Sequence, residues 1–386
     1  MKNIFYWSPF ISKVATIKAV INSAHSVNKY SKKNLYKTNI IDAVHEWSDY
    51  EELLREKKIG LIYLNKKSNF KKFYKKGFIM SRLTYLYIFF KSFFSLNKLL
   101  TEKKPEFLII HLITSLPLML FCFYKYETKL ILRISGLPKM NFFRRILWQI
   151  ASKNIYKVTC PTNDTYKDLS KFKFLKDKLF ILSDPIINIK DINSSKKNIP
   201  KLDNKILDII NNKKFFLSIG RFTRQKNFLF YLKCIPEILK IDKDLFFIFI
   251  GNGEEKNLFL EKARKLNITD KVYIVDYTDN VHFFLKKSKA FVLTSLWEDP
   301  GFVLVEAGYN NCQVISSNCP NGPLEIVGND GGYLFESNSK YNFIDTIKSY
   351  INDLEEKQKL KKIILKKRIN KFTSYQHYLS IKKILN

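Results

Sequence analysis

Apolar segments of strand length alternate with segments of helix length along almost the whole of this 386-residue chain. The strand candidates are residues 3–7, 59–64, 107–111, 129–135, 156–160 and 178–183, followed by 214–220, 245–251, 271–277, 289–295, 312–317 and 331–335. Continuous apolar strands that are joined by helices form parallel sheets covered on both faces. The alternation therefore predicts an α/β fold.

A polar stretch at residues 191–205 interrupts the alternation and divides it into two series. Two series predict two doubly wound, Rossmann-like domains, and 386 residues are enough for two domains of ordinary size. We expect an N-terminal domain at 1–190 and a C-terminal domain at 191–367. A C-terminal helix at about 368–386 is expected to pack back on the first domain.

The longest uncharged run, residues 107–124, approaches the length of a membrane span. Pro117 interrupts this run, and His111 would lie at bilayer depth. A buried strand followed by a short buried helix is therefore favoured over a membrane span. No signal peptide is expected at the N-terminus, and five cysteines without a CxxC pair fit a cytoplasmic protein.

The net charge of +32 is distributed unevenly along the chain. Residues 1–190 hold 35 Lys and Arg against 13 Asp and Glu, which gives +22, whereas the remaining residues give +10. Such a field attracts anionic surfaces or phosphorylated ligands. Coding bias towards lysine could explain the total charge but not its asymmetry.

Ligands of doubly wound sheets bind beyond the carboxyl ends of the strands. In the second half of the chain, three strand candidates end in segments rich in charge or glycine: RFTRQKN at 221–227, GNGEE at 251–255 and LWEDPG at 296–301. Arginine, lysine and a helix N-terminus suit a diphosphate, and carboxylates suit sugar hydroxyls. These strand ends therefore predict a site for a ligand that carries both groups.

These residues resemble the donor-site signature of the family-4 retaining glycosyltransferases of the GT-B fold. The signature elements are Arg221-x4-Lys226, Gly251-Asn-Gly253-Glu254 and Glu298-x7-Glu306. The resemblance covers residues 214–335 closely and the N-terminal half loosely. It implies two Rossmann-like domains that face each other across a cleft, and transfer of a sugar from a nucleotide-diphosphate donor, with a UDP-linked donor favoured.

The resemblance also implies a role for each matching residue. Arg221 and Lys226 would hold the diphosphate, and Glu306 would bind the ribose hydroxyls. Glu298 would hold the transferred sugar, as a catalytic residue. The other expected donor-binding residues are Gly251, Gly253, Glu254, Asp276, Tyr277, Gly301, Phe302 and Val303. Because neither Arg221 nor Lys226 has the pattern of a core residue, replacing either one is expected to affect transfer far more than stability.

An Asp-x-Asp pair occurs at Asp242 and Asp244, but it precedes the strand candidate at 245–251. It would thus lie at the wrong end of the sheet to meet a donor, so we expect neither a metal site nor a cofactor. Fixed cations would stabilise the leaving phosphate instead. Retention of the anomeric configuration is implied by the resemblance alone.

In the N-terminal half, His111 ends a strand candidate, and the family often has a histidine at a matching strand end. The alternatives are a catalytic histidine and a hydrogen-bonded core residue. Arg133, Ser135 and Gly136 follow the next strand and are expected to line the same cleft. The chain departs from the family pattern in one respect, because it has no glycine before Gly60 and so lacks a glycine-rich loop after its first strand.

Residues 66–104 contain eleven Lys or Arg, one acidic residue and ten Phe or Tyr. Such interleaving suits a membrane interface or single-stranded nucleic acid, and an ordinary amphipathic core helix with basic flanks is the plainer alternative. With the transferase hypothesis, it favours a lipid-linked acceptor, such as a polyprenyl diphosphate sugar, or another glycan acceptor of surface-polysaccharide (for example lipopolysaccharide) biosynthesis. The enzyme would then work peripherally on the anionic inner face of the cytoplasmic membrane, without nucleic acid.

Two rival functions remain from the sequence. A sugar-nucleotide epimerase would share the fold but not the paired arginine–lysine and glutamate–glutamate elements. A non-enzymatic protein that binds lipid or nucleic acid would explain the charge but not the convergence of strand ends.

Overall fold

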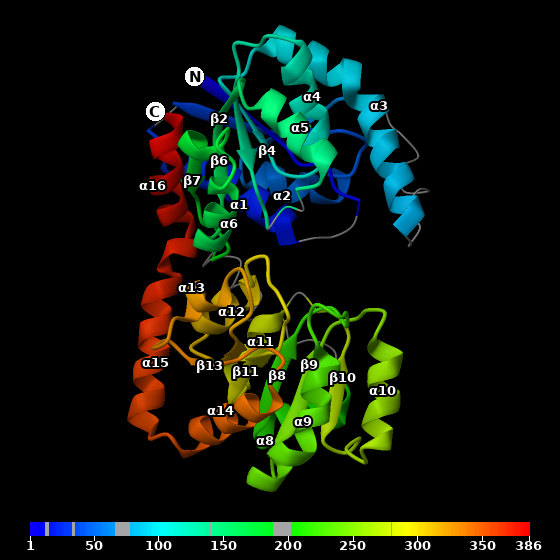
Figure 1. Cartoon of the computed structure of the whole chain (residues 1–386), viewed down its shortest axis with the longest axis vertical. Helices are drawn as coiled ribbons and strands as arrows, with labels where there is room; N and C mark the ends of the chain where they lie inside the picture. Colours follow the sequence, from blue (N-terminus) through cyan, green and yellow to red (C-terminus); the bar gives the residue numbers. More distant parts are fainter. Residues whose placement is uncertain are drawn as a thin grey trace. The chain divides into compact units, whose positions relative to one another are not determined.

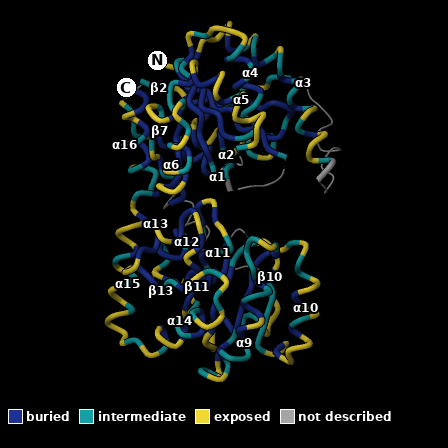
Figure 2. The backbone as a smooth tube through the Cα atoms, viewed as in Figure 1, coloured by how far each residue is buried: buried dark blue, intermediate teal, exposed yellow. Residues whose placement is uncertain are grey.

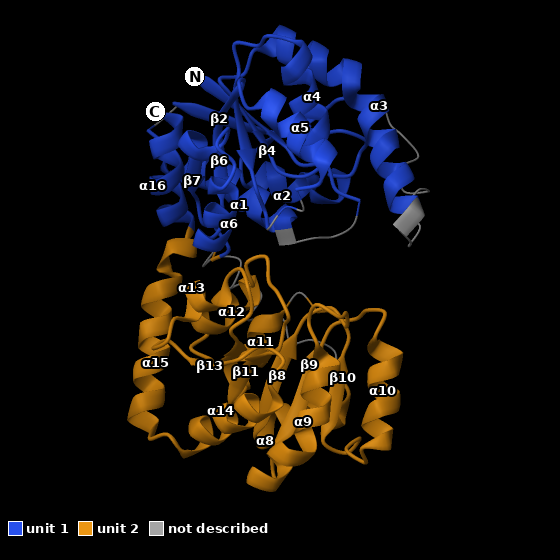
Figure 3. Cartoon of the chain, in the orientation of Figure 1, with its two compact units in different colours: residues 1–186, 374–386 blue, residues 187–373 orange. Residues whose placement is uncertain are grey.

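The computed structural model describes residues 1–11, 15–32, 35–65, 78–136, 138, 140–187, 202–278 and 280–386. The chain forms two compact units (Figure 3). Unit 1 contains Met1–Ile186 and Ser374–Asn386, and unit 2 contains Ile187–Thr373. The sequence placed the first boundary between residues 190 and 191 and the return to the first domain at about 368.

Unit 1 is built on a seven-stranded parallel sheet in the order β3-β2-β1-β4-β5-β6-β7 (Figure 1). Its strands are β1 (Lys2–Trp7), β2 (Tyr36–Asp42), β3 (Gly60–Tyr63), β4 (Phe107–Ile110), β5 (Lys129–Arg133), β6 (Ile155–Cys160) and β7 (Leu179–Ile181).

Helices cover both faces of this sheet, because alternate residues of the strands are apolar on both sides. In β1, Ile4 and Tyr6 join one core, and Phe5 and Trp7 join the other. The first core is closed by α1 (Ala15–Tyr30), α2 (Glu51–Glu56) and α16 (Ser374–Leu385). The second is closed by α3 (Phe78–Lys103), α4 (Ser115–Phe123), α5 (Phe142–Ala151) and α6 (Asn163–Ser170).

Strand β2 was not predicted, although it lies inside the sheet between β1 and β3. Its segment, YKTNIID, reads as polar, but Thr38 is fully buried and Asn39 nearly so. The Thr38 amide donates to Asn28 Oδ1 at 3.1 Å, and its hydroxyl donates to the Ala24 carbonyl at 3.3 Å. Helix α1 thus satisfies polar groups that the sequence pattern counts against a strand.

Unit 2 is built on a six-stranded parallel sheet in the order β10-β9-β8-β11-β12-β13. Its strands are β8 (Phe215–Ile219), β9 (Phe246–Ile250), β10 (Val272–Val275), β11 (Ala290–Leu293), β12 (Gln313–Ser317) and β13 (Tyr333–Phe335). Its helices are α8 (Asn204–Asn212), α9 (Phe228–Ile241), α10 (Lys256–Lys265), α11 (Val281–Lys287), α12 (Phe302–Tyr309), α13 (Pro323–Val327), α14 (Lys340–Asn352) and α15 (Glu355–Arg368). The strands of both sheets are largely buried (Figure 2). The predicted α/β fold with two Rossmann-like domains is confirmed.

The uncharged run at 107–124 forms β4 and α4, as predicted; β4 is fully buried, and α4 is largely buried except at its C-terminal end. Among the described residues, no helix is both long and apolar enough to cross a membrane.

Candidate functional site

The turns that follow β8 and β9 pack backbone against backbone. The Gly220 amide donates to the Ile250 carbonyl at 2.9 Å, and the Phe222 amide donates to the Asn252 carbonyl at 3.0 Å. A Cβ at Gly251 would lie 1.9 Å from Gly220 O, and one at Gly253 would lie 2.4 Å from Phe222 O. The two glycines are therefore needed to bring the two turns together; approach of a ligand to their backbone stays a prediction.

A cluster of four phenylalanine rings packs next to these turns. The Phe222 ring lies 5.0 Å from that of Phe228 and 5.2 Å from that of Phe259 in edge contacts, and Phe249 packs against the last two. All four rings are buried, and they come from the β8 turn, α9, β9 and α10. The cluster fixes the backbone that precedes Lys226.

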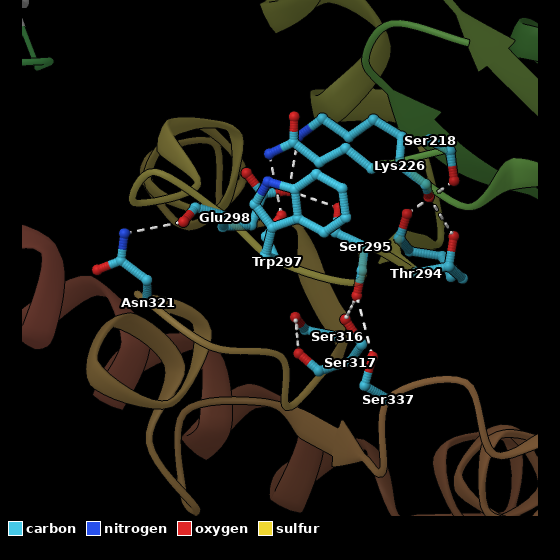
Figure 4. Close-up of polar contacts among 12 residues, drawn as sticks. Ser218, Lys226, Thr294, Ser295, Trp297, Glu298, Ser316, Ser317, Asn321 and Ser337 are labelled. Carbon is cyan, nitrogen blue, oxygen red and sulfur yellow. Dashed lines mark hydrogen bonds and ion pairs between the residues drawn. The ribbon is translucent and has the colours of Figure 1, made fainter. Parts of the chain in front are cut away.

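Lys226 reaches across Gly220 to Glu298 (Figure 4). Its Nζ lies 2.6 Å from Glu298 Oε1, and a Cβ at Gly220 would come within 2.9 Å of Lys226 Cε. The side chain of Glu298 is only 4% exposed and that of Lys226 17%, so the ion pair is largely shielded from water. The Ser295 hydroxyl donates to the same carboxylate oxygen at 2.5 Å.

The segment after β11 is tied to the Lys226 turn by further hydrogen bonds. The Thr294 hydroxyl donates to the Lys226 carbonyl at 3.0 Å, and the Leu296 amide donates to the Gln225 carbonyl at 2.8 Å. The Gln225 side chain donates in turn to the Trp297 carbonyl at 3.0 Å. Lysine and glutamate are thus held by rigid backbone on both sides of their contact.

The loop after β12 holds Glu298 from the other side. Asn321 Nδ2 donates to the Glu298 carbonyl at 2.9 Å and to Asp299 Oδ1 at 3.0 Å, and the Glu298 amide donates to the Pro320 carbonyl. A Cβ at Gly322 would lie 1.9 Å from Pro300 O, so this loop also needs a glycine. Sequence reasoning missed Ser295 and Asn321, because neither carries charge and both read as ordinary turn residues.

Glu306, the second carboxylate of the pattern, lies half-buried on α12. Gly301 precedes this helix with a φ of 88°, which favours glycine. The Leu304 amide donates to the Gly301 carbonyl, whereas the amides of Phe302 and Val303 have no hydrogen bond within the described residues. Such first-turn amides can accept a ligand oxygen.

The remaining predicted donor residues of unit 2 follow β8, β9 and β10. Arg221 is exposed and has no ion-pair partner in the described part of the chain. Asp276 accepts from Lys256 Nζ at 2.6 Å, Tyr277 is 73% exposed, and Glu254 is exposed before α10. Lys256 is a further cation that the pattern did not reveal.

Asp242 and Asp244 lie before β9, at the amino end of the sheet, as predicted. Asp242 accepts from the Asp244 amide at 3.1 Å and pairs with Lys214 at 3.7 Å. Within the described ranges, no three His, Cys, Asp or Glu side chains group together in a way that could hold a metal ion.

In unit 1, His111 follows β4 and is 6% exposed. Its amide donates to the Trp7 carbonyl, and its ring stacks near Tyr6 at 6.2 Å. Among the residues that the structure describes, its Nε2 has no hydrogen-bond partner. Burial, with the charge of Arg133 as a second cause, lowers the pKa of His111 well below its usual value. The ring is therefore neutral at physiological pH.

Arg133 ends β5 and forms a buried ion pair with Asp184, and its Nη1 has no hydrogen-bond partner within the described ranges. Its guanidinium is only 2% exposed, so it has a structural task; contact with a ligand stays a prediction. Ser135 and Gly136 are half-buried in the segment that follows. The structure thus brings Lys226, Glu298 and the 301–306 segment together in unit 2, and it places His111 and Arg133 in the other unit.

Known proteins resemble this chain in sequence. Residues 201–367 match the family model described as Glycosyl transferases group 1. An uncharacterized glycosyltransferase of Methanocaldococcus jannaschii is 29% identical over 333 residues, which are 82% of this chain and 77% of that protein.

Two further proteins match in part of the sequence or in fold. N-acetylgalactosamine-N,N'-diacetylbacillosaminyl-diphospho-undecaprenol 4-alpha-N-acetylgalactosaminyltransferase of Campylobacter jejuni is 26% identical over 147 residues, 38% of this chain and 40% of that enzyme. The structure of HepE from Anabaena, in complex with UDP and glucose, has a TM-score of 0.70 and 11% identity over 100% of this chain and 99% of that one. At that identity the likeness to HepE shows the fold alone.

Residues 201–367 therefore resemble a group 1 glycosyltransferase domain, and the two Rossmann-like units share the fold of GT-B structures. The chain is a nucleotide-sugar-dependent glycosyltransferase, and one partial relative is named as a glycosyltransferase that acts on a diphospho-undecaprenol-linked sugar.

Proposed function

We propose that the protein is a retaining glycosyltransferase of family 4 that moves a sugar from a UDP-linked donor to a lipid-linked acceptor. The observation that carries the proposal is the arrangement of cations and carboxylates in unit 2. Lys226 and Glu298 meet at 2.6 Å beyond β8 and β11, and the exposed Arg221 follows β8 directly. Glu306 lies on the helix that leads away from the same loop.

The leaving group of the reaction is a nucleoside diphosphate. The bond between the sugar C1 and the diphosphate oxygen breaks, C1 bonds to the acceptor hydroxyl oxygen, and the hydroxyl proton passes to the released phosphate. Arg221 and Lys226 would stabilise the charge that develops on that phosphate, so no metal ion is required in this proposal. The first-turn amides of Phe302 and Val303 would support Glu298 in binding the transferred sugar.

The Lys226–Glu298 ion pair would affect how the donor binds. Each of the two charges neutralises the other, so neither is left alone in a shielded position. A diphosphate that accepts from Lys226 would release Glu298 towards the sugar hydroxyls. Phosphate and sugar binding would therefore be coupled through one ion pair.

The choice of donor and acceptor rests on the relatives. HepE was crystallised with UDP and glucose, and the Campylobacter enzyme is named for a diphospho-undecaprenol acceptor. Because such acceptors reside in membranes, the protein would work peripherally at the inner face of the cytoplasmic membrane, in the synthesis of a surface polysaccharide.

The test is to incubate the purified protein with a panel of nucleotide sugars and an undecaprenyl-diphosphate sugar acceptor. We expect release of UDP that depends on the acceptor, and a product whose anomeric configuration, read by NMR, equals that of the donor. An inverted product would contradict retention. Conversion of the donor to an epimer without UDP release would contradict transfer altogether.

A further inference from the structure

Helix α3 is apolar on the side that faces away from its own unit. Its inward stripe, which includes Ile88, Leu96 and Leu100, is buried in the core. Its outward stripe carries Leu83, Leu86, Phe90 and Phe94, which are 53%, 48%, 70% and 75% exposed. An ordinary amphipathic core helix has polar residues there. The inward stripe fits the core-helix interpretation of residues 66–104, but that interpretation does not explain the exposed apolar stripe; residues 66–77 lie outside the described part.

Helix α5 has the same unusual pattern. Trp148 and Ala151 are buried against the core. Phe142, Phe143, Ile146 and Ile150 are 72%, 80%, 40% and 53% exposed, at the spacing of one helix face. The Asn141 side chain accepts from the Arg144 amide at 2.9 Å and fixes the helix start. Two phenylalanine rings are therefore held in the first turn, where solvent surrounds them.

The two outward stripes belong to one layer of helices. Helices α3, α4 and α5 pack on the same face of the sheet, and α4 touches both of the others. The end of α4 adds Phe123 and Tyr124, which are 72% and 41% exposed. We call these outward residues of α3, the end of α4 and α5 the aromatic face; exposed backbone along α3 and α5 can be followed in Figure 2.

The charge around the aromatic face is predominantly positive. Residues 78–104 and 141–153 contain Arg82, Lys91, Lys98, Lys103, Lys104, Arg144, Arg145 and Lys153. Glu102 is the one acidic residue in these two segments. Exposed rings within a basic field are the chemistry of a protein that binds an anionic lipid surface, because the rings enter the interface while the cations meet the headgroups.

A second copy of the chain fits this face less well. In a two-fold dimer the same surface patch meets itself. The basic residues of one copy would then approach those of the other, and like charges repel.

We infer that the aromatic face of unit 1 is the surface by which the protein docks on an anionic bilayer, with Phe142, Phe143, Phe90 and Phe94 entering the interface. The inference deepens the proposed function. It rests on that function in one respect only, because the proposed lipid-linked acceptor gives the reason why a glycosyltransferase would need to bind a membrane. It assigns the contact to two defined helices.

The experiment is a vesicle flotation assay with the full chain and without donor or acceptor. Its outcome is therefore independent of whether the protein transfers a sugar. Vesicles of phosphatidylglycerol and phosphatidylcholine are compared with vesicles of phosphatidylcholine alone. We expect binding to the anionic vesicles only, weaker as salt rises from about 0.05 M to about 0.5 M but not abolished, because the aromatic contribution is not screened.

The variant Phe142→Ser/Phe143→Ser should bind anionic vesicles at least about tenfold more weakly, because two exposed rings are lost. Its matched control is Tyr341→Ser/Leu354→Ser in unit 2, which removes two side chains that are 80% and 77% exposed. The control should bind as the unmodified chain does. Both variants should keep their melting temperature and their affinity for UDP.

Three results would overturn the inference. The first is equal vesicle binding by the Phe142/Phe143 variant and its control. The second is failure of the unmodified chain to bind anionic vesicles at low salt. The third is a concentration-dependent dimer that the unmodified chain forms and the variant does not. The last would make the aromatic face a self-association surface. Tight binding of single-stranded nucleic acid in place of vesicles would assign the basic field to another partner.

Discussion

Replacing Lys226 by alanine should unfold unit 2 more easily as well as weaken donor binding. Two unit charges 2.6 Å apart attract by about 6 kcal/mol at an effective dielectric constant of about 20. Desolvation offsets much of this attraction, but truncation of one partner leaves the other charge buried, which costs about 3–5 kcal/mol in proteins. Because the Ser295 hydroxyl still donates to Glu298, we expect about 3 kcal/mol.

The assay is thermal unfolding by calorimetry, with urea unfolding as a second measurement. A loss of about 3 kcal/mol corresponds to a melting temperature about 6–12 °C lower for a domain of this size. The exposed Arg221 is the matched control: Arg221→Ala should leave the melting temperature unchanged while slowing transfer at least about a hundredfold. The buried ion pair thus corrects, for Lys226, the expectation that stability would hardly change.

A double-mutant cycle separates the ion pair from other effects of the lysine. In Lys226→Ala/Glu298→Gln the remaining side chain is neutral, so this double variant should be more stable than Lys226→Ala alone. If the costs of the two single substitutions simply add, or if Lys226→Ala melts with the unmodified chain, the coupling between the two charges is refuted.

Three other outcomes follow from the structure. Glu306→Gln should weaken the affinity for free UDP in calorimetric titration, whereas Glu298→Gln should mainly lower turnover; equal loss of UDP affinity would contradict the assignment of ribose and sugar. His111→Ala should lower stability by about 2 kcal/mol because the ring is buried, and a variant with normal melting but turnover reduced tens of fold would instead place the imidazole at the sugar. Burial lowers the pKa of His377 to about 3, so the unfolded chain binds a proton below about pH 6.5 that the folded chain does not. The free energy of unfolding should therefore fall between about pH 6.5 and 3, by up to about 1.4 kcal/mol per pH unit, and less steeply in His377→Gln.

Most of the fold could be predicted from the sequence, because parallel strands buried on both faces leave long apolar runs such as 245–251 and 289–295. Strand β2 was not predicted, because its sequence is polar. Its polar groups form hydrogen bonds with α1, and this tertiary contact is not visible in the local sequence pattern. The helical return to unit 1 was expected, and α16 is anchored there by a hydrogen bond of 2.8 Å between His377 Nε2 and the Ser23 hydroxyl.

The site could be predicted in its charged members but not in its internal contacts. Spacing alone indicated Lys226 and Glu298 at neighbouring strand ends, because the carboxyl ends of parallel strands share one edge. That the two side chains neutralise each other depends on the missing Cβ of Gly220, which opens the path of the lysine. Support from Ser295 and Asn321 depends on loops whose course no periodic pattern encodes.

The two ends of unit 2 lie side by side: Ile187 and Thr373 form a parallel bridge, and the Ile187 amide donates to the Phe372 carbonyl at 3.0 Å. Unit 2 is therefore a continuous insertion in unit 1, and the chain enters and leaves it at two adjacent positions. Because the two ends of an inserted domain such as unit 2 are adjacent, the domain can be replaced by changing only two neighbouring junctions, and the chain path of unit 1 stays the same. In evolution, this topology would allow a different unit 2 to be combined with an unchanged unit 1. A protein engineer could make the same exchange at the same two junctions.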